Sequence, residues 1–293
     1  MPEAKSSPPP GEPSGRSGVS PTPVPAPVLL EARGVSKAFS GIYVLRDADL
    51  TLDHGTIHAL MGENGAGKST FMKILSGVHT EYEGEIRVDG AEARFAGVRD
   101  AERAGIAIIH QELNLVAGLS VAENIFLGRE TRRRGFVGRR LRVLDRPAMA
   151  KEAGKALATL GIGISDVRAR TGLLSGGERQ AVAVARAVTW GQKVLLLDEP
   201  TAALAVVEQR KIEDLVNQVK KQDVGVILVS HNLRQVYELC DRVHVLLHGR
   251  VAGVLPKKDA TPEELVRWIT GVAVESGHDI PEEVAEAELH PEE

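Results

Sequence analysis

Short apolar runs alternate with longer amphipathic stretches between about residue 28 and residue 274. Four of these runs predict strands, namely Thr56–Met61, Gly105–Gln111, Val194–Leu197 and Val224–Ser230. The run Val194–Leu197 is wholly apolar, which is typical of a strand that is buried on both faces of a parallel sheet. Strands that alternate with helices in this way predict an α/β fold with a largely parallel core sheet.

Two regions depart from this alternation. Residues Val28–Val88 are rich in strand-forming residues, and we expect an antiparallel β part there. The stretch from about Glu112 to Val188 is expected to be mostly helical and to form an inserted helical subdomain. The folded domain is thus predicted to span residues 28–274, with the helical subdomain inserted at about 112–188.

Both ends of the chain are poor in apolar residues. Residues 1–27 are rich in proline and residues 275–293 are acidic, so neither segment can bury much apolar surface, and both are predicted to be flexible tails. Just before the second tail, Thr261–Glu264 combine an N-cap, a proline at the first helical position and a capping-box glutamate. This pattern predicts a helix through Ile269 that closes the folded domain.

The composition supports a sizeable core but few special features. Of the 293 residues, 43% are hydrophobic and only 3% are aromatic, so the core must consist mainly of Val, Leu, Ile and Ala. The single cysteine, Cys240, excludes an intramolecular disulfide and is expected to be a buried thiol in the helix after His231. No apolar run approaches the about twenty residues of a membrane span, so we expect a soluble chain.

Two clusters of charged or metal-binding residue types have alternative interpretations. Six arginines in Arg129–Arg140 could indicate nucleic-acid binding, but the net charge of −4 and the lack of useful interleaved aromatic residues favour a solvated loop. His244 and His248 have the spacing of a helical zinc pair, but they fall in a predicted strand, where they would lie about 13 Å apart. We assign no metal site made by protein groups alone.

The sequence GENGAGKST at Gly62–Thr70 follows a predicted strand and fits G-x-x-x-x-G-K-[ST]. Its three glycines let backbone N–H groups turn inward around the β- and γ-phosphates of a nucleotide. Lys68 adds a positive charge for the same oxygens, and the Ser69 hydroxyl can bind Mg²⁺. A glycine-rich turn that binds nothing is the alternative, although a chance match is expected in only about one per cent of such chains. The predicted nucleotide-binding residues are Gly62, Glu63, Asn64, Gly65, Ala66, Gly67, Lys68, Ser69 and Thr70.

A second predicted anion site lies in the sequence LSGGERQ at Leu174–Gln180. Ser175 is a good helix N-cap, and Gly176 and Gly177 expose bare N–H groups at the start of a helix that can run to Val188. A capped helix without a ligand is the other interpretation. Because one ATP does not need two γ-phosphate sites from one subunit, we expect two chains about a two-fold axis, each lending this loop to the other's phosphate loop.

Two carboxylates end the apolar run in VLLLDE, at Val194–Glu199. The ends of such strands are where ligands bind in open α/β sheets. Asp198 is therefore expected to hold Mg²⁺, and Glu199 is expected to orient and polarise the attacking water. His231 stands at the end of another predicted strand, where it could donate a hydrogen bond to the γ-phosphate.

Taken in order, GENGAGKST, Gln111, LSGGERQ, Asp198–Glu199 and His231 resemble the ATP-binding cassette (ABC) ATPases, which are P-loop NTPases. The resemblance covers roughly Leu29 to Gly271, and LSGG is its most specific element. It implies ATP and Mg²⁺ as cofactors and hydrolysis of ATP. The implied catalytic residues are Lys68, Gln111, Glu199 and His231; the implied Mg²⁺ ligands are Ser69, Gln111 and Asp198.

The resemblance also implies an aromatic ring stacked on adenine. Phe39 stands at the matching position, Tyr43 is its rival, and packing in the core is the alternative for both. One position departs from the family pattern: many relatives have an aspartate after the segment Thr201–Leu204, where this chain has Ala205. The loss of that carboxylate affects coupling between subunits, but the predicted ligands of Mg²⁺, water and phosphate remain.

The stretch His110–Arg129 is similar to the ATPases of monosaccharide importers of the ribose, xylose and fructose type. This similarity implies an ATPase subunit on the cytoplasmic side of the membrane, attached through permease subunits and served by an extracytoplasmic sugar-binding protein, with no nucleic-acid partner. Most such ATPases carry two cassettes, whereas this chain has one and is expected to form a homodimer. The alternatives are a soluble non-transport ABC ATPase acting on nucleic acid or the ribosome, and an exporter ATPase.

Overall fold

The structure is a computed structural model that describes residues 28–110, 113–133, 143–202 and 204–275. Gln111, most of both predicted tails and the second half of the arginine cluster lie outside the described residues. The predictions made for them therefore stay predictions.

The N-terminal part forms a four-stranded antiparallel sheet, as predicted. Its order is β2-β1-β4-β5, and the bounds of these strands are Ile42–Asp53, Val28–Phe39, Glu83–Val88 and Ala91–Glu92. The strand β3 (Ile57–Gly62) interrupts this region in sequence and belongs to the second sheet. The expected β-rich N-terminal part is thus divided between two sheets.

The second sheet forms the core and has six strands in the order β10-β9-β3-β8-β7-β6. Its parallel pairs run from β9 to β6, and only β10 is antiparallel to its neighbour. The α/β fold with a largely parallel core sheet is therefore confirmed. The strands other than β3 span Ile106–Ile109 (β6), Val194–Asp198 (β7), Gly225–Val229 (β8), Arg242–Leu247 (β9) and Arg250–Pro256 (β10).

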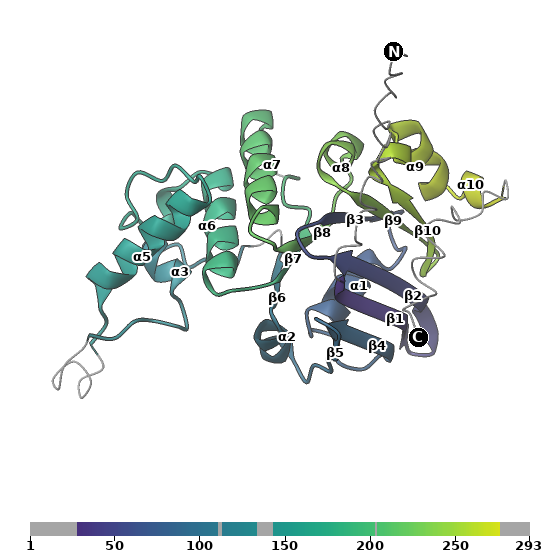
Figure 1. Ribbon diagram of the computed structural model, residues 1–293, viewed down its shortest axis with the longest axis horizontal. Coiled ribbons are helices and arrows are strands. Elements are labelled where there is room, and N and C mark those ends of the chain that lie inside the picture. Colours follow the sequence, from purple (N-terminus) through teal and green to yellow (C-terminus); the bar gives the residue numbers. More distant parts are fainter. Residues whose placement is uncertain (1–27, 111–112, 134–142, 203, 276–293) are drawn as a thin grey trace, which may run out of the picture.

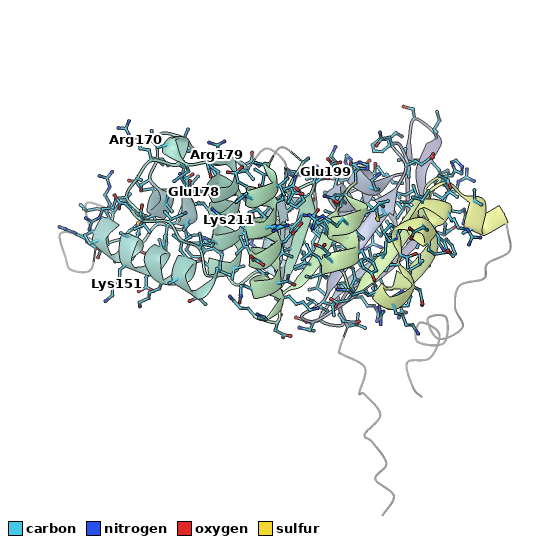
Figure 2. All side chains as sticks on the ribbon, turned by 90° about the horizontal axis from the view of Figure 1, so that it is seen from above. Lys151, Arg170, Glu178, Arg179, Glu199 and Lys211 are labelled. Atoms are coloured by element: carbon cyan, nitrogen blue, oxygen red, sulfur yellow. The ribbon has the colours of Figure 1, made fainter. Side chains whose placement is uncertain are left out.

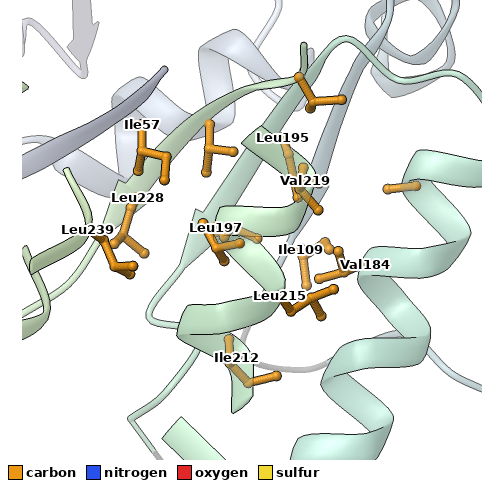
Figure 3. Close-up of a cluster of buried hydrophobic side chains, with 14 of the residues drawn as sticks. Ile57, Ile109, Val184, Leu195, Leu197, Ile212, Leu215, Val219, Leu228 and Leu239 are labelled. Atoms are coloured by element: carbon orange, nitrogen blue, oxygen red, sulfur yellow. The ribbon is translucent and has the colours of Figure 1, made fainter. Parts of the chain in front are cut away.

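The central strands are apolar because both faces of the sheet are covered. On β7, Leu195 and Leu197 point to one hydrophobic cluster, and Val194 and Leu196 point to the other. The first cluster packs against α6 and α7, where Val184 and other side chains meet the sheet (Figure 3). The second contains side chains of α1 and the antiparallel sheet. This alternation is what the two-residue period of a strand requires.

Helices surround the core sheet and also form a lobe at one end of the molecule, where α3, α5 and α6 lie together (Figure 1). Between α5 and α6, residues 160–175 form turns and one short 3-10 helix, Thr171–Leu173, so this described part of the lobe is less helical than expected. The helices span Lys68–Leu75 (α1), Val98–Ala104 (α2), Val121–Ile125 (α3), Arg146–Thr159 (α5), Gly176–Thr189 (α6), Val206–Lys220 (α7), Leu233–Leu239 (α8), Pro262–Ile269 (α9) and Val272–Glu275 (α10).

Three local predictions need correction or refinement. The side chain of Thr261 caps α9 as expected, but the Glu264 carboxylate accepts a hydrogen bond from the Trp268 indole at 3.0 Å instead of closing a capping box. Cys240 is buried, just after the end of α8 and not within it. The strand β9 holds His244 but ends before His248, which lies in the following turn. Within the described residues, no helix is long and apolar enough to cross a membrane.

Candidate active site

The loop between β3 and α1 has the backbone that a phosphate-binding loop needs. Gly62, Gly65 and Gly67 have φ values of 145°, 84° and 108°, which side chains disfavour. A Cβ atom on Gly62 would lie 2.2 Å from the Leu246 carbonyl oxygen, so no larger residue fits there. A Cβ on Gly65 would meet nothing within 4 Å, so Gly65 is required by its backbone angle alone.

Lys68 begins α1 and folds back over this loop. Its ammonium group donates hydrogen bonds to the carbonyl oxygens of Gly62 at 2.7 Å and Glu63 at 2.9 Å. Burial lowers the pKa of Lys68, while Glu199 and Asp198 raise it. The lysine is therefore buried at the loop with two carboxylates near enough to favour its charge. The next residue, Ser69, is exposed in the first turn of α1.

The two predicted carboxylates lie at the carboxyl end of β7. Burial raises the pKa of Asp198, with a further contribution from Glu199, whereas His110, Lys73 and Lys68 lower it. The neighbouring Glu199 has a φ of 49°, a conformation that is uncommon for this residue type. Its N–H donates to the Val229 carbonyl oxygen at 3.0 Å, which ties the end of β7 to the end of β8.

His231 follows β8 and meets Glu199. Its Nε2 atom lies 2.9 Å from Glu199 Oε1. Both side chains remain partly exposed, at 52% and 33%, so a ligand could reach them. The structure thus brings together four of the predicted residues, namely Lys68, Asp198, Glu199 and His231, at one edge of the core sheet. Gln111 is outside the described residues.

A buried polar group that the sequence did not reveal holds these loops together. Gln235, in α8, accepts hydrogen bonds from Ser230 Oγ at 2.8 Å and Thr201 Oγ1 at 3.2 Å. Ser230 directly precedes His231, and Thr201 follows Glu199 by two residues, so Gln235 fixes the loops of both residues to one helix. A single glutamine in a helical stretch gives no sequence signal of such a role.

Both aromatic candidates for adenine binding are 42% exposed, so the interpretation of core packing is wrong for both. The Tyr43 ring lies under the Arg46 guanidinium at 5.0 Å, and its hydroxyl donates to Glu83 at 3.3 Å. Phe39 and His79 form an edge-to-face ring pair with centroids 5.3 Å apart, and Lys37 Nζ lies 5.2 Å over the Phe39 ring. Since both rings carry a cation but only Tyr43 also has a polar partner at its hydroxyl, Phe39 remains our candidate for adenine stacking.

The second predicted anion site is well formed but lies elsewhere. Ser175 caps α6, and a capping box joins its side chain and backbone to Glu178. Figure 1 places α6 in the lobe with α3 and α5, whereas α1 lies beside the antiparallel sheet. Figure 2 likewise shows Glu178 and Glu199 at separate positions along the molecule. Within one chain, the two predicted phosphate sites are therefore apart.

Comparison with known proteins decides the family. The model of the ABC transporter family matches residues 45–202, which include the phosphate loop, the loop before α6 and the carboxylates after β7. The chain belongs to the ABC transporter family. The predicted membership is therefore confirmed, and with it an ATP-binding ATPase.

Curated relatives agree with this result. The chain is 43% identical to the fructose import ATP-binding protein FrcA of Rhizobium meliloti over 83% of the chain and 94% of that protein. It is 41% identical to the xylose/arabinose import ATP-binding protein XylG of Sulfolobus acidocaldarius, over 84% and 95%. A ribose import ATP-binding protein RbsA of Chromobacterium violaceum is 46% identical, but the chain spans only 46% of its length.

Solved structures show the same ABC ATPase fold. The crystal structure of the ADP conformation of MJ1267, an ATP-binding cassette of an ABC transporter, has a TM-score of 0.70 at 21% identity, covering 85% of this chain and 99% of that one. A dimeric post-hydrolysis structure of the cassette MJ0796 bound to ADP and Pi has a TM-score of 0.64 at 24% identity, covering 78% and 99%.

Proposed function

We propose that this chain is the ATP-hydrolysing subunit of a membrane importer for a simple sugar. The observation that carries the proposal is the meeting of Lys68, Asp198, Glu199 and His231 at the carboxyl ends of adjacent strands. The names of the curated relatives, which are fructose, xylose/arabinose and ribose import ATP-binding proteins, support the sugar class. The proposed ATPase domain spans residues 28–274, including the lobe at 112–188.

Each residue has a role that follows from its position. Lys68 would exchange its bonds to two loop carbonyls for the β- and γ-phosphate oxygens. Glu199 would accept a hydrogen bond from the attacking water and polarise it, since its carboxylate is partly exposed at the strand end. His231 Nε2 lies 2.9 Å from that carboxylate in the nucleotide-free chain, and on ATP binding it would turn its N–H from Glu199 to the γ-phosphate.

The donor groups also fit a Mg²⁺ ion. Among the described residues no three His, Cys, Asp or Glu side chains gather as a metal site, so an ion here would need phosphate oxygens and water as further ligands. Ser69 and Asp198 would supply hard oxygen ligands, with Gln111 as the third predicted ligand. When bound, Mg²⁺ neutralises charge on the β- and γ-phosphates.

A second copy of the chain would complete the nucleotide site. The Ser175–Gly177 loop and the phosphate loop are apart within one chain, so the loop that faces a bound γ-phosphate would come from the other subunit of a homodimer (Figure 1). Two-fold symmetry then gives two equivalent sites. The cassette MJ0796 has been seen as a dimer with ADP and Pi, which supports this arrangement.

The permease would dock on the cleft of about 410 Å³ between α2, β6 and α6. The exposed apolar side chains of Val78, Val98 and Leu127 line this cleft and suit an apolar helix of a membrane partner. The chain would then lie on the cytoplasmic face of the membrane and contact the sugar-binding protein only indirectly.

Capture of the permease with the tagged chain tests this docking site. Val98→Asp should abolish recovery of the permease, while Val266→Asp, on the exposed face of α9, should not.

Measuring ATP hydrolysis by a variant of Glu199 tests the catalytic assignment. Glu199→Gln should lower ATP turnover by about 10³-fold while ATP binding persists, because only the polarising carboxylate is lost. The exposed Glu263→Gln is the matched control and should keep the parent rate. Turnover of Glu199→Gln at the parent rate would refute the catalytic assignment.

Capture from detergent-solubilised native membranes tests the biological role separately. A multispanning permease recovered with the tagged chain, together with a sugar-binding protein, would support import. A permease without any binding protein would favour an exporter, and recovery of ribosomes or DNA-repair proteins would replace the transport function with that of a soluble ABC ATPase.

A further inference from the structure

The Ser175–Gly177 loop already has an anion bound to it, and that anion belongs to the same chain. The Glu208 carboxylate, in the first turn of α7, accepts a hydrogen bond from the Gly177 N–H at 3.4 Å. Ser175, the Gly177 N–H and the Ala205 N–H lie near enough to hold the pKa of Glu208 below its usual range. The carboxylate therefore occupies an N–H donor that a phosphate oxygen would need.

The packing around this contact is close. A Cβ atom on Gly177 would lie 3.1 Å from the Glu208 Cβ, and a Cβ on Gly176 would lie 2.9 Å from the Leu204 Cδ2. The start of α7 thus rests directly on the start of α6, along a cleft of about 330 Å³ that Ser175, Gly177 and Glu208 all line. The two glycines allow this approach, so the contact is part of the packed structure of the nucleotide-free chain.

Glu208 is also linked to the catalytic carboxylate. Only the segment 200–205 separates the start of α7 from Glu199, and Ala205 is the N-cap of α7, three residues before Glu208. Ala205 stands at the position after Leu204 where many relatives have an aspartate that communicates between subunits. Glu208 therefore joins the loop that serves one nucleotide site to the strand end that serves the other.

We propose that Glu208 is a positioning residue that blocks the Ser175–Gly177 loop until ATP on a second copy displaces it. The proposal rests on the dimeric ATPase proposed above. In the free chain the Glu208 carboxylate accepts the hydrogen bond of the Gly177 N–H. In the closed dimer the γ-phosphate takes that N–H, and Glu208 turns toward Lys211, which lies three residues along α7 and lines the same cleft (Figure 2).

ATP-driven dimerisation of the full chain tests the proposal. In a Glu199→Gln background, dimer formation is followed by sedimentation as ATP is titrated. Adding Glu208→Gln removes the competing charge, so the half-saturating ATP concentration should fall by about 3–10-fold. Glu208→Asp, which retracts the carboxylate by one methylene, should also lower the half-saturating ATP concentration. Asp214→Asn removes one exposed charge from the same helix and should leave this concentration unchanged.

Amide hydrogen exchange provides a second readout that does not depend on nucleotide. In the free chain, Glu208→Gln should speed exchange at the Gly177 N–H, while Asp214→Asn should not. If the Glu199→Gln parent never dimerises with ATP, the dimeric ATPase fails and the role of Glu208 fails with it. If that parent dimerises but Glu208→Gln leaves the ATP requirement unchanged or raises it, only the role of Glu208 is refuted.

Discussion

Acidification should destabilise the folded protein through one buried pair of histidines. His58 in β3 and His244 in β9 are both 0% exposed, their rings stack, and His58 Nδ1 lies 3.1 Å from His244 Nε2. Burial, with Arg242 and Lys220 adding to it, lowers the pKa of His58 from 6.5 to about 3. Burial also lowers the pKa of His244, and His58 and Arg242 lower it further. Both imidazoles therefore stay neutral in the folded state.

The size of the effect follows from proton linkage. Below about pH 6.5 the unfolded chain binds protons at both histidines, whereas the folded chain does not, so stability falls as the pH falls toward about 3. At about pH 5 the loss is about 2 kcal/mol for each histidine, or about 4 kcal/mol for the pair. This is a large share of the 5–15 kcal/mol stability that is typical of a folded protein.

Urea unfolding followed by circular dichroism at about pH 7.5 and about pH 5 measures this loss. Other groups titrate in the same range, so the informative quantity is the difference between the parent and a His58→Leu/His244→Leu variant. Between the two pH values, the free energy of unfolding of the parent should fall by about 4 kcal/mol more than that of the variant. A difference below about 1 kcal/mol would refute the reasoning, because it would mean that the folded state also binds these protons.

Three further results are expected. Gly67→Ala should lower the free energy of unfolding by about 2–4 kcal/mol and abolish ATP binding, because the new Cβ atom would lie 2.8 Å from the Leu45 side chain. Gly65→Ala has open space for its Cβ atom and should cost only about 1–2 kcal/mol in thermal unfolding. Equal losses for the two variants would contradict the steric argument. Asn124→Ala should cost about 3 kcal/mol in chemical denaturation, since this buried amide bonds both backbone groups of Val116 and one group in each of three other residues. His231→Ala should lower ATP turnover by at least about 10²-fold without weakening ATP binding, and parent-like turnover would exclude its role.

Much of the site could be read from the sequence because its chemistry depends on local motifs. A glycine-rich turn that ends in Lys68 and an apolar strand that ends in Asp198 and Glu199 are each set by a few consecutive residues. The N-cap at Ser175 is equally local and is present as predicted. The roles of these residues in catalysis remain predictions until variants are measured.

Contacts between distant segments were the part that the sequence did not reveal. Gln235 joins the loops of Thr201 and Ser230, His58 meets His244 across 186 residues, and Glu208 bonds the first turn of α6. None of these residues stands in a motif, because each acquires its role only when strands pair and helices pack. Two local predictions failed for the same reason. His248 lies in the turn after β9 and not in the predicted strand, and the Glu264 carboxylate bonds the Trp268 indole instead of closing the predicted capping box.

The alternation of strands and helices, the phosphate loop and the chemical groups at the predicted strand ends follow from local sequence, because hydrophobic period, glycine placement and capping act within a few residues. The folded structure alone shows which strand ends lie side by side, which polar groups are buried together, and that the first turn of α6 contacts Glu208. Those outcomes depend on parallel pairing and close packing between segments far apart in the chain, which no local pattern specifies.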